Sequence, residues 1–210
     1  GKNSTAKGGS SIAMGEEANA EAADSVVIGK KARAQAATAS GDSGATTAVG
    51  AVVIGSNAKG SGTNATAVGQ AANAFGQNSF AGGQASKALG KSSVAVGDGA
   101  QASKDAATAT GAYSSASGAG ATANGYNSKA EADASVAIGH SAVAKANGAG
   151  AFGKSAQASA SKALAFGDSA VAGNNDAVAL GSGAKTAAAV GTNTATVGAL
   201  IYSGFAGAAP

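Results

Sequence analysis

The sequence predicts an all-β solenoid, a parallel β-roll of stacked coils of 14 residues with two short strands in each coil. Three observations predict this fold. Glycine returns at a fixed interval along most of the chain, the residues before each of these glycines alternate in character, and an Ala-x-Ala unit follows after a polar pair. Alternation with a period of two is typical of strands, and a 14-residue unit is too short for two helices.

Glycine sets the length of the repeat. The series is Gly1, Gly15, Gly29, Gly41, Gly55, Gly69, Gly83, Gly97, Gly111, Gly125, Gly139, Gly153, Gly167 and Gly181. Every step is 14 residues except the 12-residue step from Gly29 to Gly41, which we expect to be a shortened turn. The series therefore predicts about thirteen coils, and the interval fails after Gly181 because Gly191 and Gly198 arrive early.

Composition narrows the classes of protein that this chain can belong to. Its 210 residues include 34 Gly, no Cys and only 12% charged residues, so a disordered low-complexity chain is the first alternative. Val and Ile recur on the 14-residue schedule, however, and this regularity predicts order. The absence of Cys excludes disulfides and thiolate metal sites. A net charge of +3 without clustered Arg is not the pattern of a nucleic-acid-binding protein.

Each coil is expected to enclose a thin core between its two strands. In the unit Ser93-Val94-Ala95-Val96-Gly97 we expect Val94 and Val96 to face the core, opposite the two alanines of Ala100-Gln101-Ala102. The residue between such alanines is mostly polar, which predicts a solvated face on the second strand.

Two departures from this pattern support the pairing of core positions. Gly150 is followed by Phe152, and Phe80 is followed by Gly82, so a glycine at one position of the first strand accompanies a large side chain at the other. Such swaps keep the core volume roughly constant.

The middle residue of each first strand is expected to point outward, and none of these residues is polar. They are Ala13, Val27, Ala39, Val53, Ala67, Ala81, Ala95, Ala109, Ala123, Ala137, Ala151, Ala165 and Ala179. An uninterrupted outward ladder of Ala and Val would be an exposed apolar patch unless another molecule covers it. We therefore expect parallel copies of the chain to associate through this ladder, although the period alone does not decide between two copies and three.

The units Ser25-Val26-Val27-Ile28-Gly29, Ser93-Val94-Ala95-Val96-Gly97 and Ser135-Val136-Ala137-Ile138-Gly139, each followed by an Ala-x-Ala step, resemble the head repeats of YadA-like trimeric autotransporter adhesins. The resemblance covers residues 1–186. It implies a left-handed parallel β-roll, a parallel homotrimer, and display on the outer membrane of a Gram-negative bacterium through an anchor outside this chain. It also implies adhesion to host matrix proteins such as collagen, fibronectin or laminin, and autoagglutination.

Two regions differ from the family pattern. Thr108-Ala109-Thr110 and Thr122-Ala123-Asn124 carry polar residues at the positions assigned to the core, so we expect weaker or hydrated coils there. Residues 187–210 include Leu200-Ile201-Tyr202-Ser203-Gly204-Phe205, which resembles a transition segment leading from a head toward a neck. We therefore divide the chain into a head, 1–186, and a transition segment, 187–210, and interpret it as an excised passenger fragment.

Candidate binding residues are basic. Lys30, Lys31, Arg33, Lys59, Lys87, Lys129 and Lys185 are expected to form a ladder along the outer strand that binds an acidic or extended partner. His140 is expected to be a surface turn residue, and Asp24, Asp133 and Asp176 to be turn formers rather than calcium ligands. No combination of nucleophile, base and acid is present, so the sequence predicts no catalytic residue, metal or cofactor.

The repeat and the resemblance together thus predict an adhesin head that is not an enzyme, and a second hypothesis is a structural spacer of a surface fibre. An ice-binding solenoid would need a regular Thr array, and only Thr108 and Thr110 pair cleanly. A hexapeptide acyltransferase would need a period of six and a catalytic His.

Overall fold

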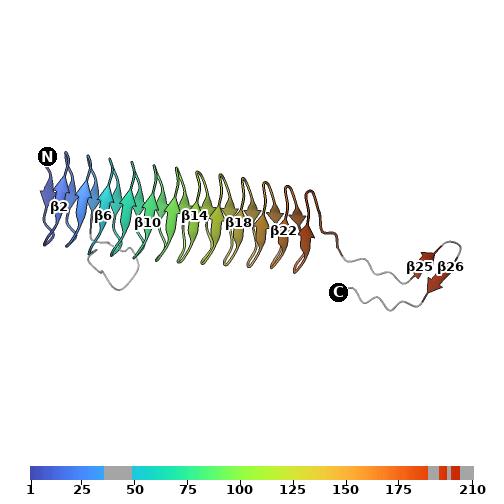
Figure 1. Cartoon of the computed structure of the whole chain (residues 1–210). Helices are drawn as coiled ribbons and strands as arrows, with labels where there is room; N and C mark the ends of the chain where they lie inside the picture. Colours follow the sequence, from blue (N-terminus) through green and yellow to red (C-terminus); the bar gives the residue numbers. More distant parts are fainter. Residues whose placement is uncertain (36–48, 189–193, 198–199, 204–210) are drawn as a thin grey trace.

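The structure, a computed structural model, describes residues 1–35, 49–188, 194–197 and 200–203. In the first two ranges the strands stack one after another along a single axis, as Figure 1 shows. They form two parallel 12-stranded sheets, and each coil contributes one strand to each sheet. The predicted parallel β-solenoid with two short strands per coil is confirmed.

We call the sheet of three-residue strands sheet B. Its strands, in order, are β2 (Ile12–Met14), β4 (Val26–Ile28), β6 (Val52–Ile54), β8 (Thr66–Val68), β10 (Phe80–Gly82), β12 (Val94–Val96), β14 (Thr108–Thr110), β16 (Thr122–Asn124), β18 (Val136–Ile138), β20 (Gly150–Phe152), β22 (Leu164–Phe166) and β24 (Val178–Leu180).

Sheet A contains the two-residue strands, which come from the Ala-x-Ala units and from equivalent units such as Ser86-Lys87-Ala88. They are β1 (Thr5–Ala6), β3 (Asn19–Ala20), β5 (Arg33–Ala34), β7 (Lys59–Gly60), β9 (Asn73–Ala74), β11 (Lys87–Ala88), β13 (Gln101–Ala102), β15 (Ser115–Ala116), β17 (Lys129–Ala130), β19 (Val143–Ala144), β21 (Gln157–Ala158) and β23 (Val171–Ala172).

The C-terminal part contains one further sheet. Strands β25 (Thr194–Val197) and β26 (Leu200–Ser203) pair antiparallel. Before them, Lys185 forms a parallel bridge with Val171. The division into a head, 1–186, and a transition segment, 187–210, stays a prediction.

The register of sheet B corrects the predicted shortened coil. Neighbouring strands pair residues 14 positions apart, as in Val94 with Thr108, whereas Val26 of β4 pairs with Val52 of β6, 26 positions away. Because β4 and β6 are direct neighbours, the 12-residue irregularity is an insertion into one coil and not an extra, shortened coil. Each sheet therefore has twelve strands rather than thirteen, and Ala39, assigned to the missing coil, lies outside the described residues.

Alanine lines the core from both sheets. In one coil Ala95 of sheet B and Ala100 and Ala102 of sheet A are all 0% exposed, while Val94 and Val96 point outward and stay partly or largely accessible. The expected orientation of sheet A is confirmed, and that of sheet B is wrong. Alternation fixes which residues share a face of a strand but not which face is inside, and the alanines of both sheets pack too closely to admit Val and Ile at every coil.

The outward ladder proposed as the interface between copies is thus part of the core. Buried within the single chain are Val27, Val53, Ala67, Ala81, Ala95, Ala109, Ala123, Ala137, Ala151, Ala165 and Ala179, and Ala13 is partly buried against them at the first coil. These side chains cannot reach another molecule, so they do not form an intermolecular contact.

The glycine and phenylalanine swaps also lie on the outer face of sheet B and not in the core. A Cβ at Gly82 would come within 2.7 Å of Phe80 Cε1, and a Cβ at Gly150 within 2.7 Å of Phe152 Cε2, so each ring lies over its glycine. Volume compensation does occur inside the core, at a pair that sequence reasoning missed. A Cβ at Gly60 would lie 2.7 Å from Val53 Cγ2, so the larger Val53 fills the space left by the missing alanine.

Two kinds of corner close each coil. After sheet B the repeated glycine adopts a positive φ, 130° at Gly97, and a Cβ there would lie 2.6 Å from the carbonyl of Gly111 in the next coil. Only glycine fits this close stacking, which explains the 14-residue glycine series. Buried serines close the turns before the strands, as when Ser93 Oγ donates to the carbonyl of Gly90 at 2.6 Å.

Candidate functional site

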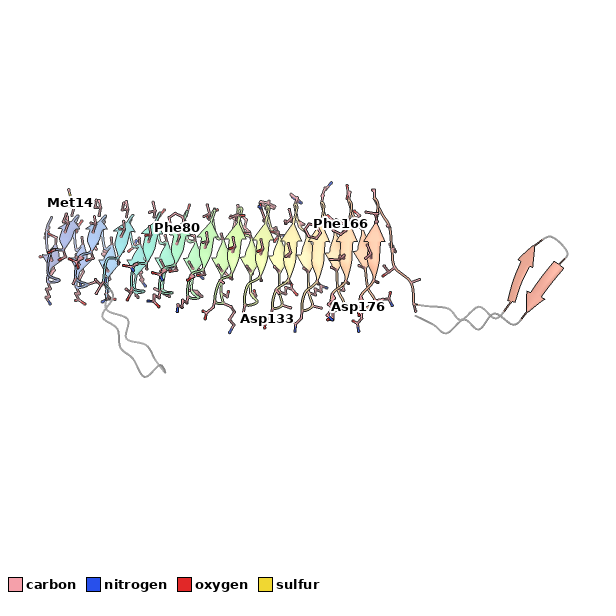
Figure 2. All side chains as sticks on the ribbon, turned by 60° about the horizontal axis from the view of Figure 1, so that its bottom comes forward. Met14, Phe80, Asp133, Phe166 and Asp176 are labelled. Atoms are coloured by element: carbon pink, nitrogen blue, oxygen red, sulfur yellow. The ribbon has the colours of Figure 1, made fainter. Side chains whose placement is uncertain are left out.

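The outer face of sheet B is apolar along most of the solenoid. Ten of its twelve strands carry aliphatic, methionine or phenylalanine side chains there. Among these residues the exposed ones are Ile12, Met14, Ile28, Ile54, Val68, Phe80, Val96, Ile138, Val178 and Leu180. Figure 2 labels Met14, Phe80 and Phe166 along this sheet. An apolar face of this extent is typical of a surface that binds another molecule.

Aromatic side chains add to this face near its C-terminal end. The rings of Phe152 and Phe166, on neighbouring strands β20 and β22, stack with centroids 4.5 Å apart and an interplanar angle of 5°. Such a pair contributes stability beyond the area that it buries. The apolar face is therefore ordered by contacts between coils before any partner binds.

A polar band interrupts this face on two adjacent strands. We define it as Thr108 and Thr110 of β14 with Thr122 and Asn124 of β16, which pair as Thr108 with Thr122 and Thr110 with Asn124. Within the described residues none of these four side chains forms a hydrogen bond. The expected weak coils are not weak in the core, because Ala109 and Ala123 fill it as alanine does elsewhere.

The outer face of sheet A is polar and carries the predicted basic residues unevenly. Arg33 and Lys59 are direct neighbours in the sheet, whereas Lys87 pairs with Asn73 and Gln101. Lys129 lies between Ser115 and Val143, and Lys185 next to Val171. The basic residues of sheet A are therefore one adjacent pair and several separate positions, not a continuous ladder.

The last two of the seven predicted binding residues, Lys30 and Lys31, lie at the corner after sheet B. Lys30 Nζ lies 3.1 Å from Glu16, and Lys31 Nζ lies 3.7 Å from Glu17, so both pair with the preceding coil. These pairs are largely exposed and contribute little to stability.

Lys31, Arg33, Asn57 and Lys59 surround an open hollow of about 240 Å³. Three cationic groups, of which Lys31 also pairs with Glu17, and an amide donor around one hollow favour an anionic ligand group such as a carboxylate or a sulfate ester. Sequence reasoning named the three cations but missed Asn57 and the hollow, because the insertion between β5 and β6 hides the fact that these two coils are neighbours.

An aromatic cluster at the corner after sheet B was also missed. Tyr113 and Tyr126 meet edge to face at 5.9 Å, and Tyr126 stacks on His140 at 5.1 Å. Tyr113 Oη donates to Asp98 at 3.0 Å, and this hydrogen bond with the adjacent carboxylate raises the pKa of Tyr113. The sequence could have predicted this cluster, since its residues are 13 to 15 positions apart and so occupy one corner of successive coils.

The acidic residues that were expected to form turns do lie at corners. Asp24 and Asp176 have φ of 52° and 56°, a conformation that Asp tolerates better than most residues. Asp133 Oδ1 accepts a hydrogen bond at 2.8 Å from the backbone N–H of Ala119 in the preceding coil. No group of three or more metal-ligating side chains occurs in the ranges that the structure describes, and no helix there could span a membrane.

The comparison with protein families is consistent with these observations. The family described as YadA head domain repeat matches residues 6–32, 61–86, 88–114, 116–142 and 158–184, which is more than half of the chain. The chain belongs to the YadA head family. Each match spans two coils of this YadA head, and the longest unmatched interval between matches, 33–60, contains the insertion. A search of curated proteins found no match.

Membership of this family, whose members are non-enzymatic adhesins, indicates an adhesin-type function at the cell surface and suggests self-association of the head. In this YadA head the outward side chains of sheet B are mostly apolar, and those of sheet A are mostly polar.

Proposed function

We propose that this chain is the head of a bacterial surface adhesin that works as a parallel homotrimer. In this arrangement three copies bury the outer faces of their B sheets against one another and present their A sheets to a partner. The observation that supports it is the contrast between an apolar sheet B and a polar, basic sheet A in one YadA head. A second copy has the same spacing of coils, so it can cover sheet B along its whole length.

The partner is proposed to be an extended host matrix protein such as collagen, fibronectin or laminin. The head would bind acidic groups of this partner, and the hollow of Lys31, Arg33 and Lys59 is the strongest candidate to hold one of them. Three copies in a trimer would give several weak contacts at once, so that avidity replaces affinity. Display on the outer membrane by type V secretion, a role in virulence and autoagglutination belong to the same proposal.

Binding to immobilised collagen, fibronectin and laminin tests the adhesive part. The folded chain should bind at least one of them above the level of heat-denatured chain, and equal binding by both would overturn it. A variant with Lys31, Arg33 and Lys59 changed to Ser should lose most of the binding. The matched control changes Lys91, Lys104 and Lys162 to Ser, which removes the same charge from the corners that follow sheet A. Equal loss in both variants would exclude the hollow as the site.

The alternative is a structural spacer of a surface fibre, and the scatter of basic residues along sheet A favours it. A spacer should assemble through sheet B as the adhesin head does, but the change of Lys31, Arg33 and Lys59 to Ser should then leave attachment of whole fibres unaltered. Light scattering on the 210-residue chain tests the assembly that both functions share.

A further inference from the structure

A repeating interface has a problem of alignment that an ordinary interface does not have. Sheet B presents nearly the same apolar pair on most strands, and adjacent strands are about 4.8 Å apart. Two copies that slide past each other by one coil would still bring eleven of twelve strands face to face. Like a weakly specified strand register, the packing of two such faces slips unless a feature of the sequence prevents it.

The polar band of Thr108, Thr110, Thr122 and Asn124 is the feature that breaks the repetition. It occupies the seventh and eighth strands of sheet B, with apolar pairs on β12 before it and β18 after it. The other polar position among these outward pairs is Thr66, whose strand also carries Val68. The band is therefore the one place in sheet B where the outward residues of two successive strands are all polar.

The four side chains of the band have no hydrogen-bond partner within the described part of the chain, so water satisfies them in a single copy. When another copy covers the face, that water is lost. In an aligned assembly each band meets the same band, and hydroxyl and amide groups can pair with one another. In an assembly shifted by two coils, each band meets Val, Ile, Gly or Phe side chains, and its polar groups are buried without partners, which is costly.

We infer that the polar band is the register key of the assembled head. This inference rests on the proposed self-association through sheet B. A polar group in an otherwise apolar interface is known to select one alignment in coiled coils at some cost in stability. Here the band holds the copies level, so that the hollows of sheet A stand at the same height on every copy.

Disulfide trapping can measure the alignment of the copies. The sequence has no Cys, so only the introduced cysteines can form disulfides. One batch carries Val68→Cys on β8 and another carries Val96→Cys on β12, two coils apart in sheet B. In an aligned assembly the two positions are about 10 Å apart along the axis, too far for a disulfide, whereas a two-coil shift brings them together. The batches are unfolded together, refolded and oxidised, and the linked peptides are identified by mass spectrometry.

The key variant changes Thr108, Thr110 and Thr122 to Val and Asn124 to Ile, the residue types of β18. The mixed 68–96 disulfide should be close to background with the natural band and should rise about ten-fold or more in the variant, the change that one unpaired buried polar group produces. The matched control changes Asn73, Gln101, Ser115 and Gln157 of sheet A to Val and should not raise it. Asn124→Ile alone, a milder change, should give an intermediate rise.

The outcomes separate this inference from the proposed function. A natural chain that stays monomeric at high concentration in light scattering would overturn the self-association itself. An assembled natural chain with abundant mixed disulfides would overturn only the register key, as would variants that assemble and stay aligned. If the four-fold variant does not fold, the same criterion applies to Asn124→Ile.

Discussion

Sheet A and sheet B have the same parallel stacking and the same 14-residue register, yet their outer faces differ in polarity and their corners differ in geometry. Val136 and Val143, which belong to one coil, illustrate the contrast. Val136 of β18 belongs to a row of apolar side chains, whereas Val143 of β19 lies between Lys129 and Gln157. An outward apolar residue is therefore part of an extended apolar surface on sheet B but an isolated position on sheet A. Its neighbours on the adjacent strands distinguish the two cases.

The largest expected effect comes from placing a charge on each face of this coil. Val136→Lys should weaken self-association by about 3 kcal/mol or more, because assembly would bury an unpaired ammonium group in every copy. Val143→Lys, the matched control, should leave assembly unchanged. Sedimentation equilibrium measures both, and circular dichroism checks that both variants keep the solenoid. Equal association of the two variants would contradict the assignment of sheet B as the interface.

The second comparison concerns the corners that follow the two sheets. Gly97, after sheet B, stacks on the carbonyl of Gly111, whereas at Gly120, after sheet A, a Cβ would meet no atom within 4 Å. Gly97→Ala should therefore lower the free energy of unfolding by about 3 kcal/mol through backbone strain and a collision. Gly120→Ala should cost about 1 kcal/mol, the cost of the left-handed conformation alone.

Thermal or urea unfolding of the two glycine variants provides the measurement. Position 120 has natural counterparts, since Ala106 and Ala134 occupy the same corner in the flanking coils with φ of 55° and 52°. If Gly97→Ala were no more costly than Gly120→Ala, the glycine series would need an explanation other than close stacking.

The sequence predicts the solenoid because the spacing of glycine is visible without any knowledge of the surroundings. It predicts the orientation of sheet A for a similar reason, since Gln101 between Ala100 and Ala102 leaves one choice. For sheet B both faces of the strand are apolar, as at Val26 and Val27, and the choice depends on how narrow the interior is. That width is set jointly by both sheets, so no single strand reveals it.

The candidate site is less predictable than the fold. The cations of the hollow were named from the sequence, but Arg33 of β5 pairs with Lys59 of β7, which is 26 positions away and not the 14 that the repeat predicts. The twelve extra residues happen to contain Gly41, which imitates a further repeat. A repeat count based on glycine alone therefore cannot distinguish a coil from an insertion.

The third prediction compares equivalent buried serines of neighbouring coils. Ser93 Oγ donates to the carbonyl of Gly90, whereas Ser79 Oγ is buried without a partner in the described part of the chain. Ser93→Ala should cost about 1 kcal/mol, the usual net value of such a hydrogen bond. Ser79→Ala should be neutral or slightly stabilising, because it removes a buried hydroxyl that has no partner. Unfolding in urea distinguishes them, and a larger cost at Ser79 would mean that its hydroxyl does have a partner.

The smallest expected effect is at the aromatic corner after sheet B, where Asp98 raises the pKa of Tyr113. The raised pKa in the folded state means that the interaction stabilises the neutral phenol. Its contribution is complete below the ordinary tyrosine pKa of about 10 and is lost as the pH rises through the higher folded value. This contact should therefore give no change of stability with pH near neutral, and stability should fall only as the pH rises above about 10.

Asp98→Asn tests this contact without removing the ring. The amide can still accept the hydrogen bond from Tyr113, but the charge that opposes a phenolate is gone, so the pKa of Tyr113 should fall toward its ordinary value. Ultraviolet titration of the tyrosines measures the shift, with Tyr113→Phe identifying which step belongs to Tyr113. Asp105→Asn is the matched control, since Asp105 accepts a hydrogen bond from the backbone N–H of Lys91 at the opposite corner and should leave the titration unchanged. An identical curve for Asp98→Asn and the natural chain would show that the carboxylate does not act on the phenol, and that the aromatic stack alone orders this corner.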